Sequence, residues 1–373
     1  MLNGRIALVI VAAFVLAAGS ARGAVPDVFA VEKVAVDVTA DTAAAARTVA
    51  LAEGEKRAFQ TLLERLTMRV DHQRLPRLEA ADIAEFVQDF SVDNEKTSTV
   101  RYIAKLNYRF FAGRVRRLLR DYGISFAETP SKPVLVLPIY RAAAAVALWD
   151  DPNPWRQAWL DRPPSEGLVP LILPLGDLAD IAAIGPDQAL RGDQAGLGRI
   201  SQRYDTKDVL VPVAALGVGN NGLPRIEVSV TRYGATQQDQ TLIASFAGEP
   251  GEPIPSILGR AAIEVAALVE DQWKADNLLQ FGRASVLAAT LPIGSLADWV
   301  EVSKRLGQVA VIDRVELVLM SRDEVRLNLH FLGEVQQLML ALSQVDLVLS
   351  DENGNWMLRR DDRAARQRRE ASR

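Results

Sequence analysis

The chain of 373 residues contains no cysteine, which excludes disulfide bonds, thiol catalysis, thiolate metal sites and a lipid attached through a lipobox cysteine. Histidine is nearly as scarce: His72 and His330 fall in different expected domains, so neither a shared metal site nor a catalytic dyad is predicted. The sequence also lacks a G-x-S-x-G elbow, a P-loop, an H-E-x-x-H motif and a G-x-G-x-x-G fingerprint. We therefore expect no cofactor, no metal ion and no catalytic residues.

Long apolar runs are absent except at the amino terminus. There, Arg5 precedes an apolar run at residues 6–18, and small residues follow it, which is the order of a secretory signal peptide. The run holds 13 residues, fewer than the ~20 that span a bilayer, so cleavage is favoured over a retained membrane anchor. Cleavage after Ala21 and cleavage after Gly23 both fit, and we assign residues 1–23 to the signal peptide. The sequence thus predicts export to the periplasm.

The composition is ordinary for a globular protein, with 49% hydrophobic and 24% charged residues. The net charge is −4, and it becomes −6 once Arg5 and Arg22 leave with the signal peptide. This acidic balance does not favour a nucleic-acid surface, and we expect no nucleic-acid partner. A mature chain of about 350 residues implies two or three domains.

Hydrophobic periodicity predicts an α+β / α/β protein of three domains. They are a small α+β domain at residues 28–128, a central α/β domain at residues 133–281 and a ferredoxin-like α+β domain at residues 283–358. Residues 128–132 are expected to form a linker. Residues 359–373 carry seven arginines against three acidic residues and almost nothing apolar, so a disordered basic tail is expected there.

Hydrophobic periodicity predicts a different order of helices and strands in each domain. In the first domain the order is β-α-α-β-β-α, with strands at 28–39, 88–94 and 99–110 and helices starting at Asp41 or Thr42, at 80–86 and at 113–122. In the second, apolar strands at 133–140, 168–175 and 209–216 alternate with helices at 154–160, 178–184 and 196–204, before a hairpin (225–233 and 241–246) and a long helix from Pro255. In the third, strands at 284–291, 309–320, 324–331 and 345–349 alternate with helices at 296–306 and 333–342, and the last strand runs on towards Trp356 through an Asn-Gly turn.

The densest unusual segment is Trp-Asp-Asp-Pro-Asn-Pro-Trp at residues 149–155. Asn153 is expected to cap a helix whose first residue is a proline. Trp155 and Trp159 then share one face of that helix and pack onto the domain. The alternative is an aromatic and acidic patch that binds a sugar or a partner protein. The residues of this possible binding patch are Trp149, Asp151, Asn153, Trp155 and Asp177.

Asp177 follows an apolar strand and precedes a helix, which is the position of a helix N-cap. Ligands of α/β proteins also bind at the carboxyl ends of strands, so a binding role remains open. Asp180 is expected to be a first-turn acid that complements the helix dipole. The arginine-rich face of residues 113–122 and the tail after Arg359 are interpreted as solvated faces, with contact to anionic lipid or glycan as the alternative.

Several phrases of the chain resemble one protein family. They are VAVDVTADTAAAARTVA from Val34, RLT from Arg65, RYIAKLNYRFF from Arg101, PVLVLPIY from Pro133, LWDDPNPWRQAW from Leu148 and GLVPLILPLGDLAD from Gly167. Over about residues 34–216 the chain resembles the uncharacterised proteobacterial family filed as domain of unknown function 2066, in its alphaproteobacterial form. The resemblance implies a signal-bearing envelope protein. It implies no activity or substrate, because none is established for that family.

Three functions are compatible with these features. The leading hypothesis is a non-enzymatic cell-envelope protein that binds one or more envelope proteins or assists envelope assembly. The rival is a periplasmic hydrolase or glycan-binding protein using Asp150, Asp151 or Asp177, which requires at least two of these carboxylates to converge in a concave pocket. The third is a protein that contacts anionic membrane or glycan peripherally through the tail at residues 359–373.

Overall fold

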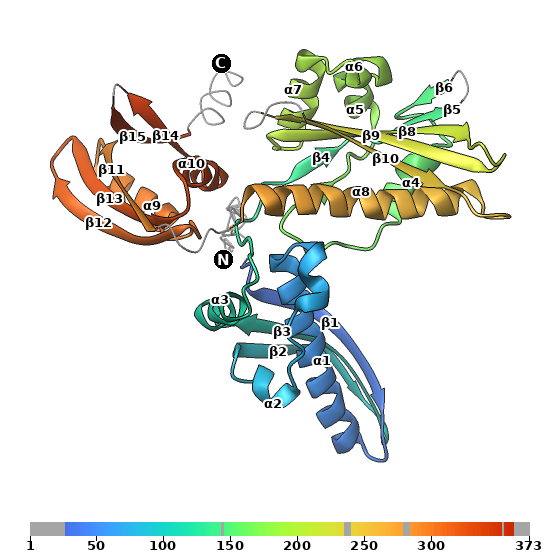
Figure 1. Cartoon of the computed structure of the whole chain (residues 1–373), viewed down its shortest axis with the longest axis horizontal. Coiled ribbons are helices and arrows are strands. Elements are labelled where there is room, and N and C mark those ends of the chain that lie inside the picture. The colour runs from blue at the N-terminus through green and yellow to red at the C-terminus, as the bar shows by residue number, and fades with distance from the viewer. Residues whose placement is uncertain (1–26, 143–144, 235–239, 279–283, 353, 362–373) are drawn as a thin grey trace, which may run out of the picture.

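The chain folds into three bodies that follow one another in the sequence (Figure 1). The computed structural model describes residues 27–142, 145–234, 240–278, 284–352 and 354–361. The signal peptide assigned to residues 1–23 therefore lies outside the described residues. Each body is built on its own β-sheet, so the protein is a mixed α+β protein with three sheets. Within the described ranges, no helix combines the length and the apolarity needed to cross a membrane.

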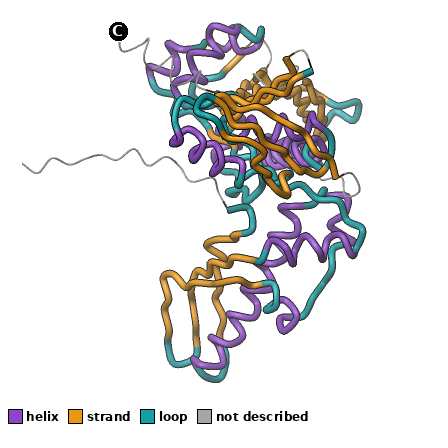
Figure 2. The backbone as a smooth tube through the Cα atoms, turned by 90° about the vertical axis from the view of Figure 1, so that its left-hand side faces the viewer, coloured by secondary structure: helices purple, strands orange, loops and turns teal. Residues whose placement is uncertain are grey.

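The first body is a three-stranded sheet with its helices on one side (Figure 2). The strand order is β1-β3-β2, and both pairs are antiparallel. The apolar stripe of α1 is buried, and Thr42 caps this helix by accepting from the backbone nitrogen of Ala45 at 3.1 Å. The predicted order of elements is confirmed, with His72 in a short 3-10 helix. The elements are β1 (Ala30–Thr39), α1 (Ala43–Leu66), η1 (Arg69–Arg74), α2 (Ala80–Ile83), β2 (Val87–Thr97), β3 (Arg101–Phe110) and α3 (Ala112–Asp121).

The second body is a seven-stranded mixed sheet between two layers of helices. Its main path is β10-β9-β8-β4-β7, with β5 joined to β8 and to β6. Successive side chains of β4 point to opposite faces: Val134 packs with α4 and α8, whereas Leu135 packs with α5 to α7. The elements are β4 (Val134–Val136), β5 (Ile139–Ala142), β6 (Ala145–Ala147), α4 (Pro154–Leu160), β7 (Leu171–Ile172), α5 (Leu178–Ala183), α6 (Pro186–Leu190), α7 (Gln194–Arg203), β8 (Asp208–Val218), β9 (Pro224–Gly234), β10 (Gln240–Ala247) and α8 (Ile254–Asp276).

Two strands of this body are shorter than the sequence predicts, and proline is the reason. The expected strand at 133–140 is divided into β4 and β5 around Pro138, which has no N–H to donate to a neighbouring strand. The expected strand at 168–175 is reduced to β7, which has only two residues and lies between Pro170 and Pro174. The short elements β6 and α6 were not predicted, because three to five residues carry too little periodicity.

The third body is a five-stranded sheet with the order β12-β13-β11-β15-β14. This order departs from the expected ferredoxin-like pattern, because β15 lies between β11 and β14 and runs parallel to β11. The expected tail also starts too early: Arg359 and Arg360 belong to β15 and pair with acidic side chains, and residues 362–373 lie outside the described residues. The elements are β11 (Ala284–Pro292), α9 (Leu296–Leu306), β12 (Ile312–Met320), β13 (Glu324–Leu332), α10 (Val335–Gln344), β14 (Leu347–Glu352) and β15 (Asn355–Arg360).

The predicted linker is packed between the three bodies rather than exposed. Thr129 accepts a hydrogen bond from the indole of Trp273 in α8 at 2.8 Å. The backbone nitrogen of Ser131 donates to the backbone oxygen of Leu168 at 2.7 Å. The backbone nitrogen of Lys132 donates to Gln344 of α10 at 2.9 Å. The linker therefore contributes to the contacts that hold the bodies together.

Glu128 opens this linker, and its buried carboxylate makes stability depend on pH. Burial raises its pKa above the ordinary 4.5, and the neighbouring Arg116 offsets this only in part. Between the pKa of Glu128 in the unfolded chain and its higher pKa in the folded chain, the folded chain retains a proton that the unfolded chain releases. The free energy of unfolding should therefore fall as the pH rises through this range. Urea unfolding measured from about pH 4 to about pH 8 should show a smaller fall in the free energy of unfolding for Glu128→Gln than for the wild type. An unchanged slope in that variant would contradict the assignment.

Candidate functional site

The tryptophans of the predicted binding patch are structural. Trp155 and Trp159 lie on the buried face of α4 with their ring centroids 5.7 Å apart in a T-shaped arrangement. The indole of Trp155 donates to the backbone oxygen of Pro212 in β8 at 2.9 Å. Trp149 is half-buried, and its indole donates to the backbone oxygen of Ile184 at 2.8 Å. The prediction that Trp155 and Trp159 pack onto the domain is therefore confirmed.

Asn153 and the acidic residues beside it do not converge on a pocket. Asn153 is the N-cap of α4: its Oδ1 accepts from the backbone nitrogen of Arg156 at 2.9 Å, and its Nδ2 donates to two backbone oxygens before the helix. Asp150 and Asp151 are exposed on the loop that precedes this cap. Neither of the two cavities described below is lined by them or by Asp177. The convergent carboxylates that a hydrolase would need are not found in this part of the structure.

Asp177 caps α5, as its position in the sequence predicts. Its Oδ1 accepts from the backbone nitrogens of Ala179 and Asp180, both at 3.0 Å, and its Oδ2 pairs with Arg203 of α7 at 2.6 Å. Asp180 lies in the first turn of α5 as expected, but it is also fully buried. Its carboxylate accepts from the backbone nitrogen of Gly176 at 2.8 Å, from Tyr204 at 2.7 Å and from Arg203 at 2.8 Å. No local pattern in the sequence reveals these distant partners.

The loop before α5 is fixed by the helices on both sides of it. Arg156 of α4 donates to the backbone oxygens of Pro174 and Leu175 at 3.1 and 2.7 Å. Tyr204 of α7 accepts from the backbone nitrogen of Leu175 at 2.8 Å. Gly176 has a φ of +79°, and a Cβ there would lie 3.0 Å from the guanidinium of Arg156. Arg156, Tyr204 and Asp180 thus hold this loop in place.

The fixed loop and α5 present three large apolar side chains to solvent. Leu175 is 74% exposed, Leu178 is 85% exposed and Ile181 is 46% exposed. We call these three residues the Leu175–Ile181 surface. It lies just beyond the carboxyl end of β7, where α/β proteins commonly bind their ligands. Sequence reasoning pointed to Asp177 in this segment and missed its apolar neighbours, because exposed and buried leucines look alike in a sequence.

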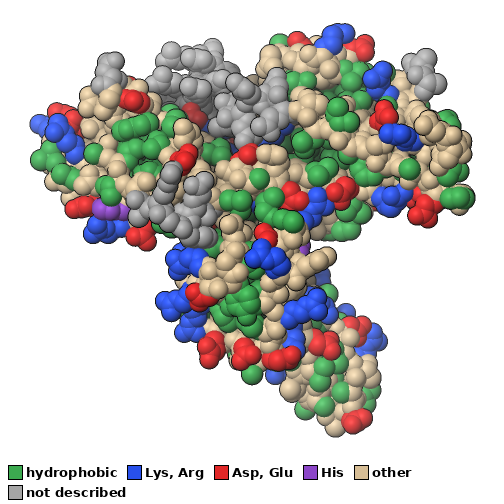
Figure 3. Space-filling model, viewed as in Figure 1, with side chains coloured by type: hydrophobic (Ala, Val, Ile, Leu, Met, Phe, Trp, Pro, Cys, Tyr) green, Lys and Arg blue, Asp and Glu red, His purple; other side chains and the backbone are tan. Residues whose placement is uncertain are grey.

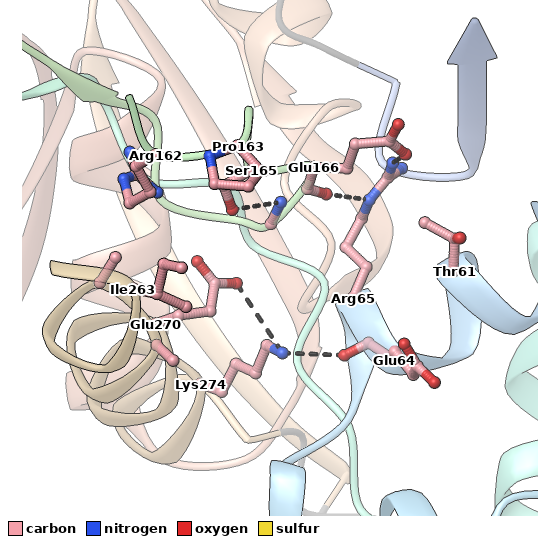
Figure 4. A pocket seen from close by; sticks show the side chains of 13 residues that line it. Thr61, Glu64, Arg65, Arg162, Pro163, Ser165, Glu166, Ile263, Glu270 and Lys274 are labelled. Atoms are coloured by element: carbon pink, nitrogen blue, oxygen red, sulfur yellow. Dashed lines mark hydrogen bonds and ion pairs between the residues drawn. The ribbon is translucent and has the colours of Figure 1, made fainter. Parts of the chain in front are cut away.

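A cavity of about 300 Å³ lies between the first and second bodies (Figure 4). Its walls are α1, the loop after α4 and α8. In Figure 4, Lys274 of α8 points toward Glu64 of α1, Glu270 lies beside Lys274, and Glu166 of the loop faces Arg65. The lining residues are Thr61, Glu64, Arg65, Arg162, Pro163, Ser165, Glu166, Gly167, Ile263, Ala266, Ala267, Glu270 and Lys274.

Two of the three cations in this cavity are fully engaged. Lys274 is buried and donates to the backbone oxygens of Glu64 and Thr67 at the end of α1, each at 2.9 Å. The Glu270 carboxylate lies 3.8 Å from its ammonium. Arg65 pairs with Glu166 at 3.2 Å and donates to two backbone oxygens near the start of β1. Burial lowers the pKa of both Lys274 and Arg65, and the nearby carboxylates oppose that shift.

Arg162 is the third cation, and it differs from the other two. It has no carboxylate partner in the described part of the chain, and its buried Nε makes no hydrogen bond. Its guanidinium lies 5.5 Å from the ring centroid of Trp159, within the range of a cation–π contact. Arg162 also lines a second groove of about 270 Å³ between α4 and α8, so it stands at the junction of the two hollows.

The arginines of α3 are only partly solvated. Figure 3 shows Lys and Arg side chains gathered over this helix. Arg116 pairs with the buried carboxylate of Glu128 at 2.9 Å, and Arg114 lies over the ring of Phe111. The basic face of α3 is thus partly committed to contacts within the protein.

Among the described residues, no group of three or more His, Cys, Asp or Glu side chains could hold a metal ion. No protein-family model matches the chain, and neither a curated protein nor a solved structure matches it. Two features of the described residues are candidate interaction sites: the Leu175–Ile181 surface and the cavity at Arg162.

Proposed function

We propose that this chain is a non-enzymatic protein of the bacterial periplasm that binds an envelope protein through the Leu175–Ile181 surface. The observation that carries the proposal is the combination of exposure and rigidity. Leu175 and Leu178 are among the most exposed large apolar side chains of the described residues, yet their loop is held by hydrogen bonds from α4, α5 and α7. Apolar surface that a protein keeps in a fixed conformation is typical of an interaction site.

The roles of the acidic residues in this segment favour binding over catalysis. Asp177 and Asp180 are the acidic groups nearest the surface, and both are occupied by helix capping and by Arg203. Apolar side chains contribute affinity on burial, at about 25 cal/mol per Å². The predicted signal peptide and the resemblance to the family of domain of unknown function 2066 support a partner in the cell envelope. An accessory role in envelope assembly agrees with three bodies joined into one chain.

Site-specific photocrosslinking tests this function. A photoreactive amino acid at position 178, in tagged full-length protein expressed in its native host, should crosslink to a distinct envelope protein. The matched control is position 243, because Ile243 is 80% exposed on β10, outside the Leu175–Ile181 surface. The intact mass of protein recovered from the periplasm should show loss of residues 1–21 or 1–23. Crosslinks to a second copy alone, or equal crosslinking at both positions, would refute the proposal.

Leu175→Asp combined with Leu178→Asp should abolish recovery of that partner, because two charges then oppose burial of the surface. Thermal unfolding should change little, since both side chains are exposed in the folded chain. Ile243→Asp should leave recovery unchanged. Quantitative pull-down with the wild-type protein and the two variants measures the effect. Full recovery with the double variant would contradict the proposed surface.

A further inference from the structure

The second feature is Arg162, which lies where the two hollows meet. The cavity between α1 and α8 holds about 300 Å³, and the groove between α4 and α8 holds about 270 Å³. Both are lined by Arg162 and Ile263. The middle of a ligand that occupied both hollows, rather than one of its ends, would therefore lie beside the Arg162 guanidinium.

Charge complementarity indicates a single negative charge at this point. Lys274 and Arg65 are already satisfied by carboxylates and backbone oxygens. Arg162 has only the face of Trp159 and no carboxylate within the described ranges. A guanidinium binds a carboxylate through two parallel hydrogen bonds, which gives both energy and geometry.

Gln157 and Asp161 line part of the groove, and both hollows also carry apolar side chains on either side of Arg162. In the groove these are Pro154, Ala158 and Pro255, with Ile263 shared by both hollows. In the cavity, Ala266 and Ala267 continue the apolar side of α8. Small apolar side chains on both sides of a carboxylate would fill these hollows and exclude water from the ion pair.

The other charges disfavour a phosphate or a polyanion. The cavity is also lined by Glu64, Glu166 and Glu270, which would repel a dianion but tolerate one neutralised carboxylate. A peptide segment can present one Asp or Glu carboxylate flanked by apolar side chains, whereas a phosphate group carries about two negative charges.

We propose that the two hollows form a binding site for an extended peptide segment in which an internal Asp or Glu side chain, flanked by apolar residues, pairs with Arg162. This site is separate from the Leu175–Ile181 surface and does not depend on the function proposed for that surface. The ligand thereby supplies the carboxylate that Arg162 does not find among the described residues.

Peptide binding to the full mature chain tests the proposal. The probes are the fluorescent peptide Ala-Leu-Glu-Leu-Ala, blocked at both ends, its Gln analogue, and Ala-Leu-Leu-Ala with a free carboxyl terminus. Fluorescence anisotropy should show the Glu peptide binding at least about tenfold more tightly than the Gln peptide, within the range of a charge-assisted pair. Arg162→Gln should remove this difference, and Arg162→Lys should restore only part of it.

Arg141→Gln is the matched control, because Arg141 is an exposed arginine of the same body and its loss changes the net charge equally. It should bind both blocked peptides like the wild type. Thermal unfolding separates binding from folding: Arg162→Gln should be at least as stable as the wild type, since it removes a partly buried cation without a partner. Equal affinity for the Glu and Gln peptides, preference for the free carboxyl terminus, or destabilisation by Arg162→Gln would overturn the proposal.

Discussion

Replacing Trp155 with alanine should remove most of the stability of the second body. The indole is fully buried between α4 and the central sheet, packs against Trp159 and donates to the backbone oxygen of Pro212. Trp→Ala substitutions in cores cost about 3–5 kcal/mol, and the orphaned oxygen adds about 1–3 kcal/mol. Because whole domains are stable by only about 5–15 kcal/mol, the variant should unfold at far lower urea than the wild type.

Urea denaturation followed by circular dichroism measures this effect. Trp155→Phe keeps an aromatic ring but loses the hydrogen bond to Pro212, so it should lie between the wild type and the alanine variant. Leu160→Ala is the control on the same helix, because Leu160 is half exposed and should cost under about 0.5 kcal/mol. If Trp155→Ala and the Leu160→Ala control unfolded at the same urea concentration, this indole would not be what holds α4 to the sheet.

Replacing Lys274 with methionine should loosen the first body from the second. The ammonium satisfies the backbone oxygens of Glu64 and Thr67 at the end of α1, and methionine fills similar space without a donor. The oxygen of Glu64 then loses this donor, and the oxygen of Thr67 keeps only its 3.4 Å contact with Nε2 of His72. Each buried oxygen left without a donor costs about 1–3 kcal/mol. Glu270 keeps its bonds from the backbone nitrogens of Leu168 and Val169, so the loss should concentrate at α1.

Hydrogen exchange locates that loss. The amides in the last turns of α1 and in η1 should exchange faster in Lys274→Met than in the wild type, whereas amides of the third body should not change. Lys304→Met is the control, because Lys304 is exposed on α9 and carries the same charge. Unchanged protection of α1 in Lys274→Met would mean that other contacts, such as those of Arg69 with Glu264 and Asp271, suffice to hold the bodies together.

Much of the fold follows from local patterns. The long helices α1 and α8, the β8–β9–β10 strands and the caps at Asn153 and Asp177 were all predictable, because periodicity and capping depend on residues three or four apart. Errors arose where an element depends on distant pairing. The reduction of β7 to two residues and the insertion of β15 beside β11 are examples.

The candidate sites divide in the same way. Sequence alone determined that cysteine chemistry is excluded, that the chain is a mixed α+β protein, and that Asn153 and Asp177 cap helices, because these properties reside in composition and short spacing. Only the tertiary structure decided that Asp180 is buried with Arg203 and Tyr204, that Leu175 and Leu178 face solvent, and that Arg162 has no carboxylate partner among the described residues. Each of these depends on contacts between side chains from distant segments of the chain, and residue type alone does not reveal those contacts.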